Sequence, residues 1–329
     1  MEKVLPFVSA LLVTRNEKDY INISLESLLN QTYPKSSYEI IVIDGYSDDG
    51  TIEIIKDLQE ECKKESFSLR ILSNDKQILA SGWNIGIREA KGNYVVRIDA
   101  HSTAAPDFIQ KSVETMQRVE AVCVGGKLIS KSLTGGDEAV SKVLSSPFGV
   151  GNSSFRVSDK EGYADTAVYG LYKKSVFEKV GFFDEKMVRN QDIELHSRIK
   201  NAGGRFYFNP EIECTYYTRN TVKKMIKQAY GNGYWNMVLL KKGSDALSIR
   251  HLVPFVFVLY LIFSFVFGFM WHWIWIVALC VLVLHLIMGV CFSLKKTNKF
   301  SEIIRMPFLF MFLHLSYGYG YLRALFKHV

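Results

Sequence analysis

Residues 92–101, Gly92-Asn93-Tyr94-Val95-Val96-Arg97-Ile98-Asp99-Ala100-His101, decide how the rest of the chain is interpreted. The apolar run after the Gly-Asn turn predicts a buried strand, and this strand ends at Asp99. An acid and an imidazole at positions i and i+2, where a strand opens into a loop, can bind one metal ion or one phosphate group. In the alternative interpretation, Asp99 caps a turn and His101 is an ordinary surface histidine.

The sequence before this stretch alternates between two periodicities. Apolar runs of four to seven residues predict strands at 7–13, 39–43, 69–72 and 94–98. Stripes of apolar residues at helical spacing predict helices at 20–31, 52–62 and 80–89. Strands that alternate with helices in this way predict an α/β fold with a parallel sheet and crossover helices.

Three of these strands end in polar residues, and in a parallel sheet ligands bind beyond the carboxyl ends of the strands. The polar residues are Thr14-Arg15-Asn16-Glu17, Asp44, and Asp99 with His101. One acid after a strand is usually a turn residue, whereas acids from three strands at one edge indicate a site. The dinucleotide glycine fingerprint and the Walker A lysine loop are both absent from the sequence. We therefore expect a divalent cation, bound by Asp99 and His101, to hold the phosphates.

The C-terminal part has the composition of a membrane protein. No Asp, Glu, Lys or Arg occurs in the 44 residues between Arg250 and Lys295. Because a span needs roughly 20 apolar residues, we expect two helices that turn near Gly268–Trp271. A second uncharged stretch, 306–322, crosses the bilayer as a third helix, lies flat on it or forms a buried core helix. The N-terminus lacks a signal-peptide layout, so a multi-pass protein of the cell (inner) membrane with residues 1–215 in the cytoplasm is expected.

The net charge of +7 does not require a nucleic-acid partner. Basic residues gather before the first expected span and after the second, as the positive-inside rule and anionic head groups favour. Residues 216–250 mix lysines with apolar and aromatic residues, which predicts an amphipathic segment at the membrane interface. The five cysteines form no close pair, so neither a disulfide framework nor a zinc site is indicated.

Four motifs in sequence order resemble the family-two inverting glycosyltransferases of GT-A fold. They are residues 8–17, 42–51, 99–101 and 190–195, and the resemblance covers residues 5–215. Residues 165–170 and 180–185 resemble most closely the membrane-attached succinoglycan-type branch. Members of that branch build bacterial exopolysaccharide or capsule repeat units on a polyprenyl diphosphate lipid.

The resemblance implies an α/β, Rossmann-like GT-A fold with a mixed, mostly parallel sheet flanked by helices. Residues 1–101 would form its nucleotide-binding half and residues 102–215 its acceptor half. Amphipathic interface helices at 216–250 and a transmembrane region of two or three helices at 251–329 would follow.

The resemblance also implies roles for individual residues. Nucleotide-binding roles fall on Thr14, Arg15, Glu17, Asp44, Ser47, Asn84 and Asp99. The metal would be bound by Asp99 and His101, the catalytic base would be Asp192, and the acceptor would meet Asp165, Thr166 and Gln191. Asp192 precedes a helix predicted at 193–202, so a plain helix cap is its alternative role. His196, one turn further on, is expected to be a packing residue.

The implied function is inverting transfer of a sugar from a UDP-sugar to a polyprenyl-diphosphate-linked saccharide. The product would belong to bacterial exopolysaccharide, capsule or O-antigen, and Mn²⁺ or Mg²⁺ would be the cofactor. The partners would be the nucleotide sugar, the lipid-linked saccharide and the membrane, without nucleic acid. Two alternatives stay open: a polyprenyl-phosphate sugar synthase, and a catalytically idle GT-A domain that serves as a binding or scaffold subunit.

Two residues depart from the family pattern. His101 stands where relatives carry an acid, and imidazole suits Mn²⁺ better than Mg²⁺. Trp83 stands before Asn84, where relatives often carry an arginine. Since an indole cannot pair with phosphate, Arg15 or Arg97 is the alternative phosphate contact.

Overall fold

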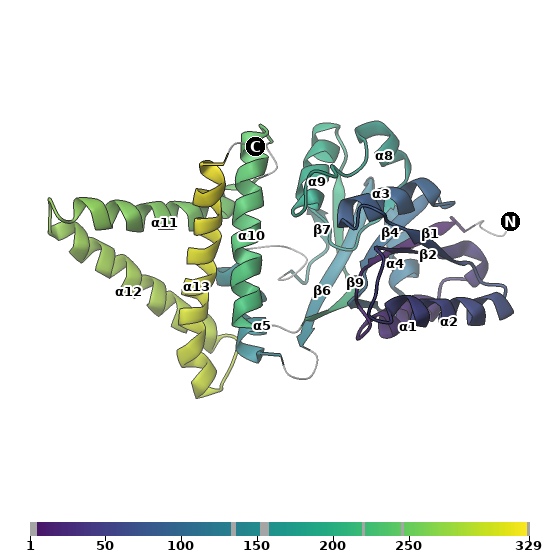
Figure 1. Ribbon diagram of the computed structural model, residues 1–329, viewed down its shortest axis with the longest axis horizontal. Coiled ribbons are helices and arrows are strands. Elements are labelled where there is room, and N and C mark those ends of the chain that lie inside the picture. Colours follow the sequence, from purple (N-terminus) through teal and green to yellow (C-terminus); the bar gives the residue numbers. More distant parts are fainter. Residues whose placement is uncertain (1–4, 133–135, 152–157, 219–220, 245–246, 328–329) are drawn as a thin grey trace. The chain divides into compact units, whose positions relative to one another are not determined.

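The computed structural model describes residues 5–132, 136–151, 158–218, 221–244 and 247–327 (Figure 1). The chain forms two compact units, which are described separately. The first comprises Met1–Lys131 and Ser154–Tyr217, and the second comprises Ser132–Ser153 and Thr218–Val329.

The first unit is built on one nine-stranded mixed sheet with the order β3-β2-β1-β4-β8-β6-β9-β5, and β7 pairs with β9. β1 pairs in parallel with β2 and β4, and β2 pairs in parallel with β3. β8 then pairs antiparallel with β4. The four predicted strands are confirmed as β1 to β4, so the predicted α/β sheet is confirmed. The strand bounds are β1 Val8–Thr14, β2 Tyr38–Asp44, β3 Leu69–Ser73, β4 Tyr94–Asp99, β5 Ser102–Ala104, β6 Cys123–Ser132, β7 Gly162–Ala164, β8 Leu171–Lys173 and β9 Phe206–Thr218.

Helices cover both faces of this sheet, and β1 is buried at every position. Val8, Ala10 and Leu12 pack into one core, whereas Leu11 and Val13 pack into the other. α1 (Ile21–Leu29), α2 (Thr51–Lys64) and α4 (Phe108–Arg118) cover the first face. α3 (Leu79–Glu89), α8 (Ser175–Val180) and α9 (Gln191–Asn201) cover the second (Figure 1).

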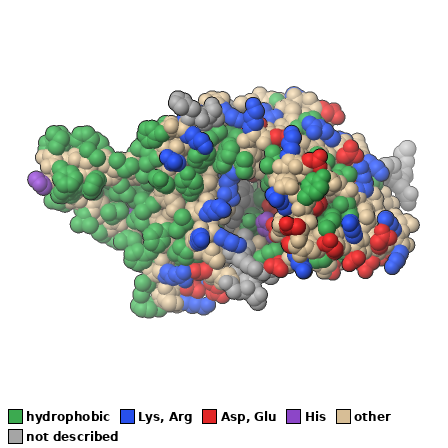
Figure 2. Space-filling model, in the orientation of Figure 1, with side chains coloured by type: hydrophobic (Ala, Val, Ile, Leu, Met, Phe, Trp, Pro, Cys, Tyr) green, Lys and Arg blue, Asp and Glu red, His purple; other side chains and the backbone are tan. Residues whose placement is uncertain are grey.

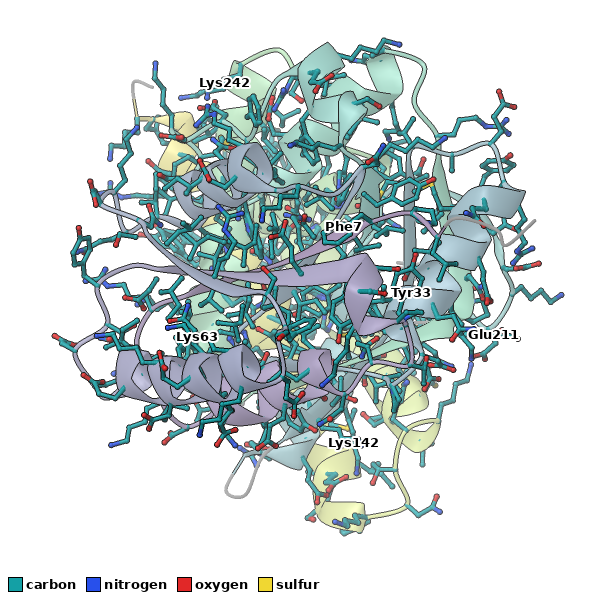
Figure 3. All side chains as sticks on the ribbon, turned by 90° about the vertical axis from the view of Figure 1, so that its right-hand side faces the viewer. Phe7, Tyr33, Lys63, Lys142, Glu211 and Lys242 are labelled. Carbon is teal, nitrogen blue, oxygen red and sulfur yellow. The ribbon has the colours of Figure 1, made fainter. Side chains whose placement is uncertain are left out.

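The amino end of β1 is fixed by a tyrosine that follows α1. The Tyr33 hydroxyl donates to the Pro6 carbonyl at 2.6 Å, and Tyr33 lies close to Phe7 in Figure 3. The opposite, carboxyl edge of the parallel strands carries the loops considered below.

The second unit consists of helices. Their bounds are α5 Glu138–Leu144, α6 Pro147–Val150, α10 Val222–Lys241, α11 Ile249–Phe267, α12 Trp273–Leu294 and α13 Phe300–Leu325. Among the described residues, α11 and α12 are the two helices long and apolar enough to cross a membrane. Their turn at residues 268–272 lies where the sequence predicted it. Most of their side chains are exposed, and Figure 2 shows hydrophobic side chains (green) covering this hairpin. So large an apolar surface is typical of contact with lipid.

The segment expected to lie along the membrane surface packs differently in the structure. Met225, Val238 and Leu239 of α10 are buried, and α10 packs along α13. Two glycines permit this close approach: a Cβ at Gly233 would overlap the Tyr317 carbonyl, and one at Gly320 would overlap the Tyr230 carbonyl. Much of the apolar stripe of α10 therefore faces another helix of its own unit.

The segment Ser132–Ser153 also differs from the expected division, because it belongs to the second unit rather than to an acceptor half. Val140 and Val143 of α5 share a core with Met306 and Phe310 of α13. In addition, Lys142 Nζ lies 2.5 Å from the carboxylate of Glu302. These contacts join residues about 160 positions apart along the chain, so local sequence pattern could not predict them.

Candidate functional site

Four neighbouring parallel strands end around one cavity of about 240 Å³. This is the carboxyl edge of the sheet, where ligands bind in open α/β folds. Of the residues predicted to form the site, Thr14, Arg15, Glu17, Asp99 and His101 line this cavity. The complete lining is Val13, Thr14, Arg15, Glu17, Gly45, Asn74, Gln77, Ile78, Leu79, Asp99, Ala100 and His101.

The loops after β1 and β2 are fastened to each other. The Asn16 amide donates to Ser47 Oγ at 2.9 Å, and the Glu17 amide donates to Thr51 Oγ1 at 2.9 Å. Ser47 Oγ in turn donates to the buried carboxylate of Asp44 at 2.6 Å. Asp44 and Ser47 are thus placed beside the cavity, where they shape the loop that carries Gly45 and fix the backbone of Asn16.

Two polar atoms in the cavity wall have no hydrogen-bond partner among the described residues. They are Thr14 Oγ1 and Asn74 Oδ1, and both side chains are almost fully buried. A buried polar atom without a partner is costly in a native protein and calls for a ligand or a water molecule. Asn74 was not among the predicted site residues. The sequence could have indicated Asn74, because this polar residue directly follows the β3 strand and so lies at the same edge as the other three strand ends.

His101 and Glu17 form a hydrogen-bonded pair in the cavity wall. His101 Nδ1 lies 3.0 Å from Glu17 Oε1, and the His101 ring packs against Tyr216 with centroids 4.9 Å apart. Asp99 accepts a hydrogen bond from the Tyr169 hydroxyl at 3.0 Å. In the described part of the chain, no three His, Cys, Asp or Glu side chains are placed to bind one ion. Asp99 and His101 both line the cavity, and the metal site predicted for them stays a prediction.

Arg97 does not reach the cavity, because its side chain is buried in an aromatic cage. Its guanidinium carbon lies 5.4, 5.4 and 4.9 Å from the ring centroids of Trp83, Tyr172 and Phe183. Burial opposes the charge, yet Tyr172, Asp192 and Asp99 offset that effect, and the pKa of Arg97 is raised. Of the two arginines considered as phosphate contacts, only Arg15 lines the cavity.

Asp192 lies in the first turn of α9, whose N-cap residue Asn190 adopts a left-handed conformation with φ 59°. The Asp192 carboxylate accepts a hydrogen bond from the Ile193 amide at 2.9 Å. It also interacts electrostatically with Arg97 and with the partly buried Arg189. Asp192 is not among the residues that line the cavity. Asp192 and Asp99 both interact electrostatically with Arg97.

The residues predicted to meet the acceptor have different surroundings. Asp165 is largely exposed and lies 3.8 Å from Lys200, and Gln191 is buried. Thr166 Oγ1 lies 2.7 Å from His196 Nδ1, and the Tyr172 hydroxyl lies 2.6 Å from His196 Nε2. Burial, and then the charges of Arg97 and Lys200, lower the pKa of His196 well below 6.5. His196 is therefore a neutral, buried residue that joins Thr166 to the aromatic cage.

Asn84, a predicted nucleotide contact, is not among the residues that line the cavity. Its amide nitrogen donates to the Phe183 carbonyl at 3.0 Å and to Glu185 at 2.9 Å. Its amide oxygen accepts from the Phe183 amide at 2.9 Å. With these bonds made and the side chain buried, Asn84 fastens the 183–185 loop to α3.

The chain is similar to known proteins in sequence and in fold. The model of "Glycosyl transferase family 2" matches residues 9–181. The chain is 33% identical to a dolichyl N-acetyl-α-D-glucosaminyl phosphate 3-β-D-2,3-diacetamido-2,3-dideoxy-β-D-glucuronosyltransferase of Methanococcus voltae, over 98% of each chain. It is 27% identical to the succinoglycan biosynthesis protein ExoA of Rhizobium meliloti, over 73% of this chain and 72% of that relative.

The mannosyltransferase PcManGT of Pyrobaculum calidifontis, solved with GDP-mannose and Mn²⁺, has a similar fold. The TM-score is 0.61 at 16% identity, over 98% of this chain and 88% of the other. This likeness confirms the predicted GT-A architecture. The family match and the full-length relative together establish that the chain is an enzyme that belongs to glycosyl transferase family 2.

Proposed function

We propose that this protein transfers a sugar, with inversion, from a nucleoside diphosphate sugar to a saccharide carried by a polyprenyl phosphate lipid. A UDP-sugar is the proposed donor. The acceptor is proposed because the relative that matches 98% of this chain is named for a dolichyl-phosphate-linked substrate. The other relative, named for succinoglycan biosynthesis, supports assembly of a surface polysaccharide.

The cavity at the carboxyl edge of the sheet is the observation that carries the proposal. Thr14 Oγ1 and Asn74 Oδ1 are buried there without partners among the described residues, and they suit the hydroxyl and amide groups of a nucleoside. Arg15 supplies a cation at the same cavity. A guanidinium is well suited to phosphate because it can donate two parallel hydrogen bonds.

The side chains at the edge of this cavity fit a divalent cation. Asp99 and His101 would hold it, and when bound it neutralises the charge that develops on the departing diphosphate. The Glu17 carboxylate at His101 Nδ1 is the arrangement that commonly orients a metal-binding imidazole. A carboxylate with an imidazole favours Mn²⁺ over Mg²⁺.

Asp192 is proposed as the general base. As the acceptor oxygen forms its bond to the anomeric carbon, the bond from that carbon to the diphosphate breaks and the proton passes to the Asp192 carboxylate. A base in this role contributes about 10²–10⁴ in rate. This carboxylate lies in the first turn of α9.

The hairpin of α11 and α12 is proposed to anchor the enzyme as a multi-pass protein of the cell membrane, with the catalytic unit on the cytoplasmic side. The two helices contain 19 and 22 residues. They are about 28 and 33 Å long at 1.5 Å per residue, which matches the hydrocarbon thickness of a bilayer. A membrane-bound enzyme and a lipid-linked acceptor meet in the same plane.

The test uses the purified full-length protein with a panel of nucleotide sugars and a polyprenyl-linked saccharide. We expect nucleoside diphosphate release that needs Mn²⁺ and is abolished by EDTA, with one sugar added to the lipid-linked product by mass spectrometry. Asp192→Asn should stop transfer yet still bind the nucleotide. Sugar found directly on polyprenyl monophosphate would instead identify a lipid-phosphate sugar synthase. Donor binding without release or transfer would identify an inactive binding subunit.

A further inference from the structure

The second unit contains a partly open cavity of about 360 Å³. All the described residues that line it belong to that unit. Its volume lies in the range of small-molecule sites, roughly 300–1,000 Å³. It lies between the 147–151 segment, the first turns of α11, and one side each of α12 and α13. The lining residues are Pro147, Phe148, Gly149, Val150, Gly151, Arg250, His251, Val253, Pro254, Phe257, His285, His314 and Tyr317.

The part of the cavity formed by the first turn of α11 favours an anion. Arg250 and His251 lie there, and none of the described lining residues is Asp or Glu. The aliphatic part of Arg250 lies against Gly151, where a Cβ would be 3.4 Å from Arg250 Cδ. This end of the cavity therefore suits a phosphate group.

Further along α11 the walls are apolar and aromatic. Phe257 stacks on His285 with ring centroids 5.3 Å apart, and Phe148 stacks on Phe292 at the same distance. Phe257 follows Arg250 by seven residues, which is about 10 Å along a helix. A ligand that fills the cavity thus has an anionic end and an apolar part next to it.

A chain of hydrogen bonds holds these walls in place. His314 Nε2 lies 2.9 Å from the Phe148 carbonyl, which can only accept, so this nitrogen carries a proton. His314 Nδ1 lies 2.9 Å from His285 Nε2. Because the chain joins α6, α12 and α13, the cavity is already formed before any ligand enters.

The position of the cavity along the α11–α12 hairpin agrees with a lipid ligand. Arg250 and His251 open α11, and Lys295 and Lys296 follow the end of α12, so both groups lie at the same end of the antiparallel hairpin. Basic residues at the end of a membrane hairpin lie at the level of the lipid head groups. The apolar part of the cavity then reaches toward the hydrocarbon region.

We propose that this cavity binds the phosphate and the first isoprene units of a polyprenyl phosphate. The inference rests on the proposed function in taking this lipid as the carrier of the acceptor. A cavity of about 360 Å³ has room for the first units of one chain, whereas a common phospholipid brings two long chains. The aromatic faces of Phe148, Phe257 and Tyr317 suit the planar, branched double bonds of an isoprenoid.

The test measures binding of farnesyl phosphate to the full-length protein in detergent by isothermal titration calorimetry. Arg250→Gln should weaken this binding about ten- to a hundredfold, the value of a hydrogen bond to a charged group. Val253→Trp should fill the cavity and abolish farnesyl phosphate binding. The Val253 side chain is 59% exposed, so the fold should tolerate this larger residue. Arg323→Gln, which removes the same charge from a different cavity of the same unit, is the matched control and should bind normally.

Unchanged affinity in both cavity variants, or loss of binding in Arg323→Gln alone, would overturn the proposal. Equal competition by dioleoyl phosphatidic acid would identify an ordinary phospholipid site and overturn it too. Arg250-dependent binding in a protein that turns over no nucleotide sugar would refute the proposed function and leave this site. Transfer to a polyprenyl-linked acceptor that Arg250→Gln does not affect would refute the site and leave the function.

Discussion

The guanidinium carbon of Arg97 lies 5.4 Å from the centroid of the Trp83 ring. This contact gives the buried Trp83 side chain a structural role in the first unit. Arg97 belongs to β4 and Trp83 to α3. The positive charge between the strand and the helix is therefore that of Arg97. The same cation is close to both Asp99 and Asp192. Arg97 therefore interacts with both the proposed metal ligand, Asp99, and the proposed base, Asp192.

Replacing Trp83 should destabilise the first unit. Trp83→Leu removes the cation–π contact and leaves a cavity, and we expect a loss of about 3 kcal/mol or more. Trp83→Phe keeps an aromatic face for Arg97 and should lose less. Thermal unfolding followed by circular dichroism gives the order. Trp83→Arg would place two cations in one buried cage, so a stable and more active Trp83→Arg enzyme would contradict this interpretation.

Removing the carboxylate that faces His101 should weaken the metal site. Glu17→Gln keeps the size of the side chain but loses the charge at His101 Nδ1. Changes in groups that orient a ligand typically cost about 10- to 100-fold in metal affinity. A titration of activity and of direct binding with Mn²⁺ measures this loss, with Glu53→Gln on the exposed side of α2 as the control. His101→Asp should shift the preference from Mn²⁺ toward Mg²⁺, and equal use of both metals by all variants would remove His101 from the site.

The unpartnered hydroxyl of Thr14 predicts two effects of opposite sign. Thr14→Val removes a buried polar atom without changing the shape, so the free protein should be as stable as the parent or slightly more so. If the hydroxyl meets the donor, the same change should weaken nucleotide binding by about 5- to 30-fold, or about 1–2 kcal/mol. Nucleotide titration and thermal unfolding of the same sample separate the effects. A destabilised variant with normal nucleotide affinity would assign Thr14 to the fold alone.

His196 predicts a particular pH dependence of stability. The pKa of His196 in the folded protein lies well below 6.5. As the pH falls below about 6.5, His196 is therefore protonated in the unfolded chain but stays neutral in the folded protein. The stability due to neutral His196 is complete above that pH and is lost progressively below it. His196→Gln, which cannot titrate, should therefore show a smaller fall in melting temperature between pH 7.5 and 5.5. Parallel curves for the two proteins would show that His196 is not buried in its neutral form.

The sequence predicts the framework of the site because the signals are local. Each strand of the parallel half is a largely apolar run, and Asp44 and Asp99 end two of these strands. The shared edge then follows from the rule that parallel strands end on the same side. Thr14, Arg15, Glu17, Asp99 and His101 lie at one cavity for this reason.

What the sequence does not predict depends on contacts between distant residues. The cage around Arg97 needs α3, β8 and the 183 loop together. Asn84 was predicted at the nucleotide because of its neighbours in sequence, whereas its amide is held by Phe183 and Glu185, about 100 residues away. Asn74 had no motif around it, and its unpaired oxygen appears only once the strand ends are assembled.

The excursion of residues 132–153 into the helical unit limits how this enzyme can be shortened for solution work. The chain passes from one unit to the other three times, after Lys131, after Ser153 and after Tyr217. Cutting it after Tyr217 would remove α13 and expose Val140, Val143 and Phe148, which pack against it, to water. A soluble catalytic fragment should therefore require a short polar linker in place of the excursion as well as removal of the tail.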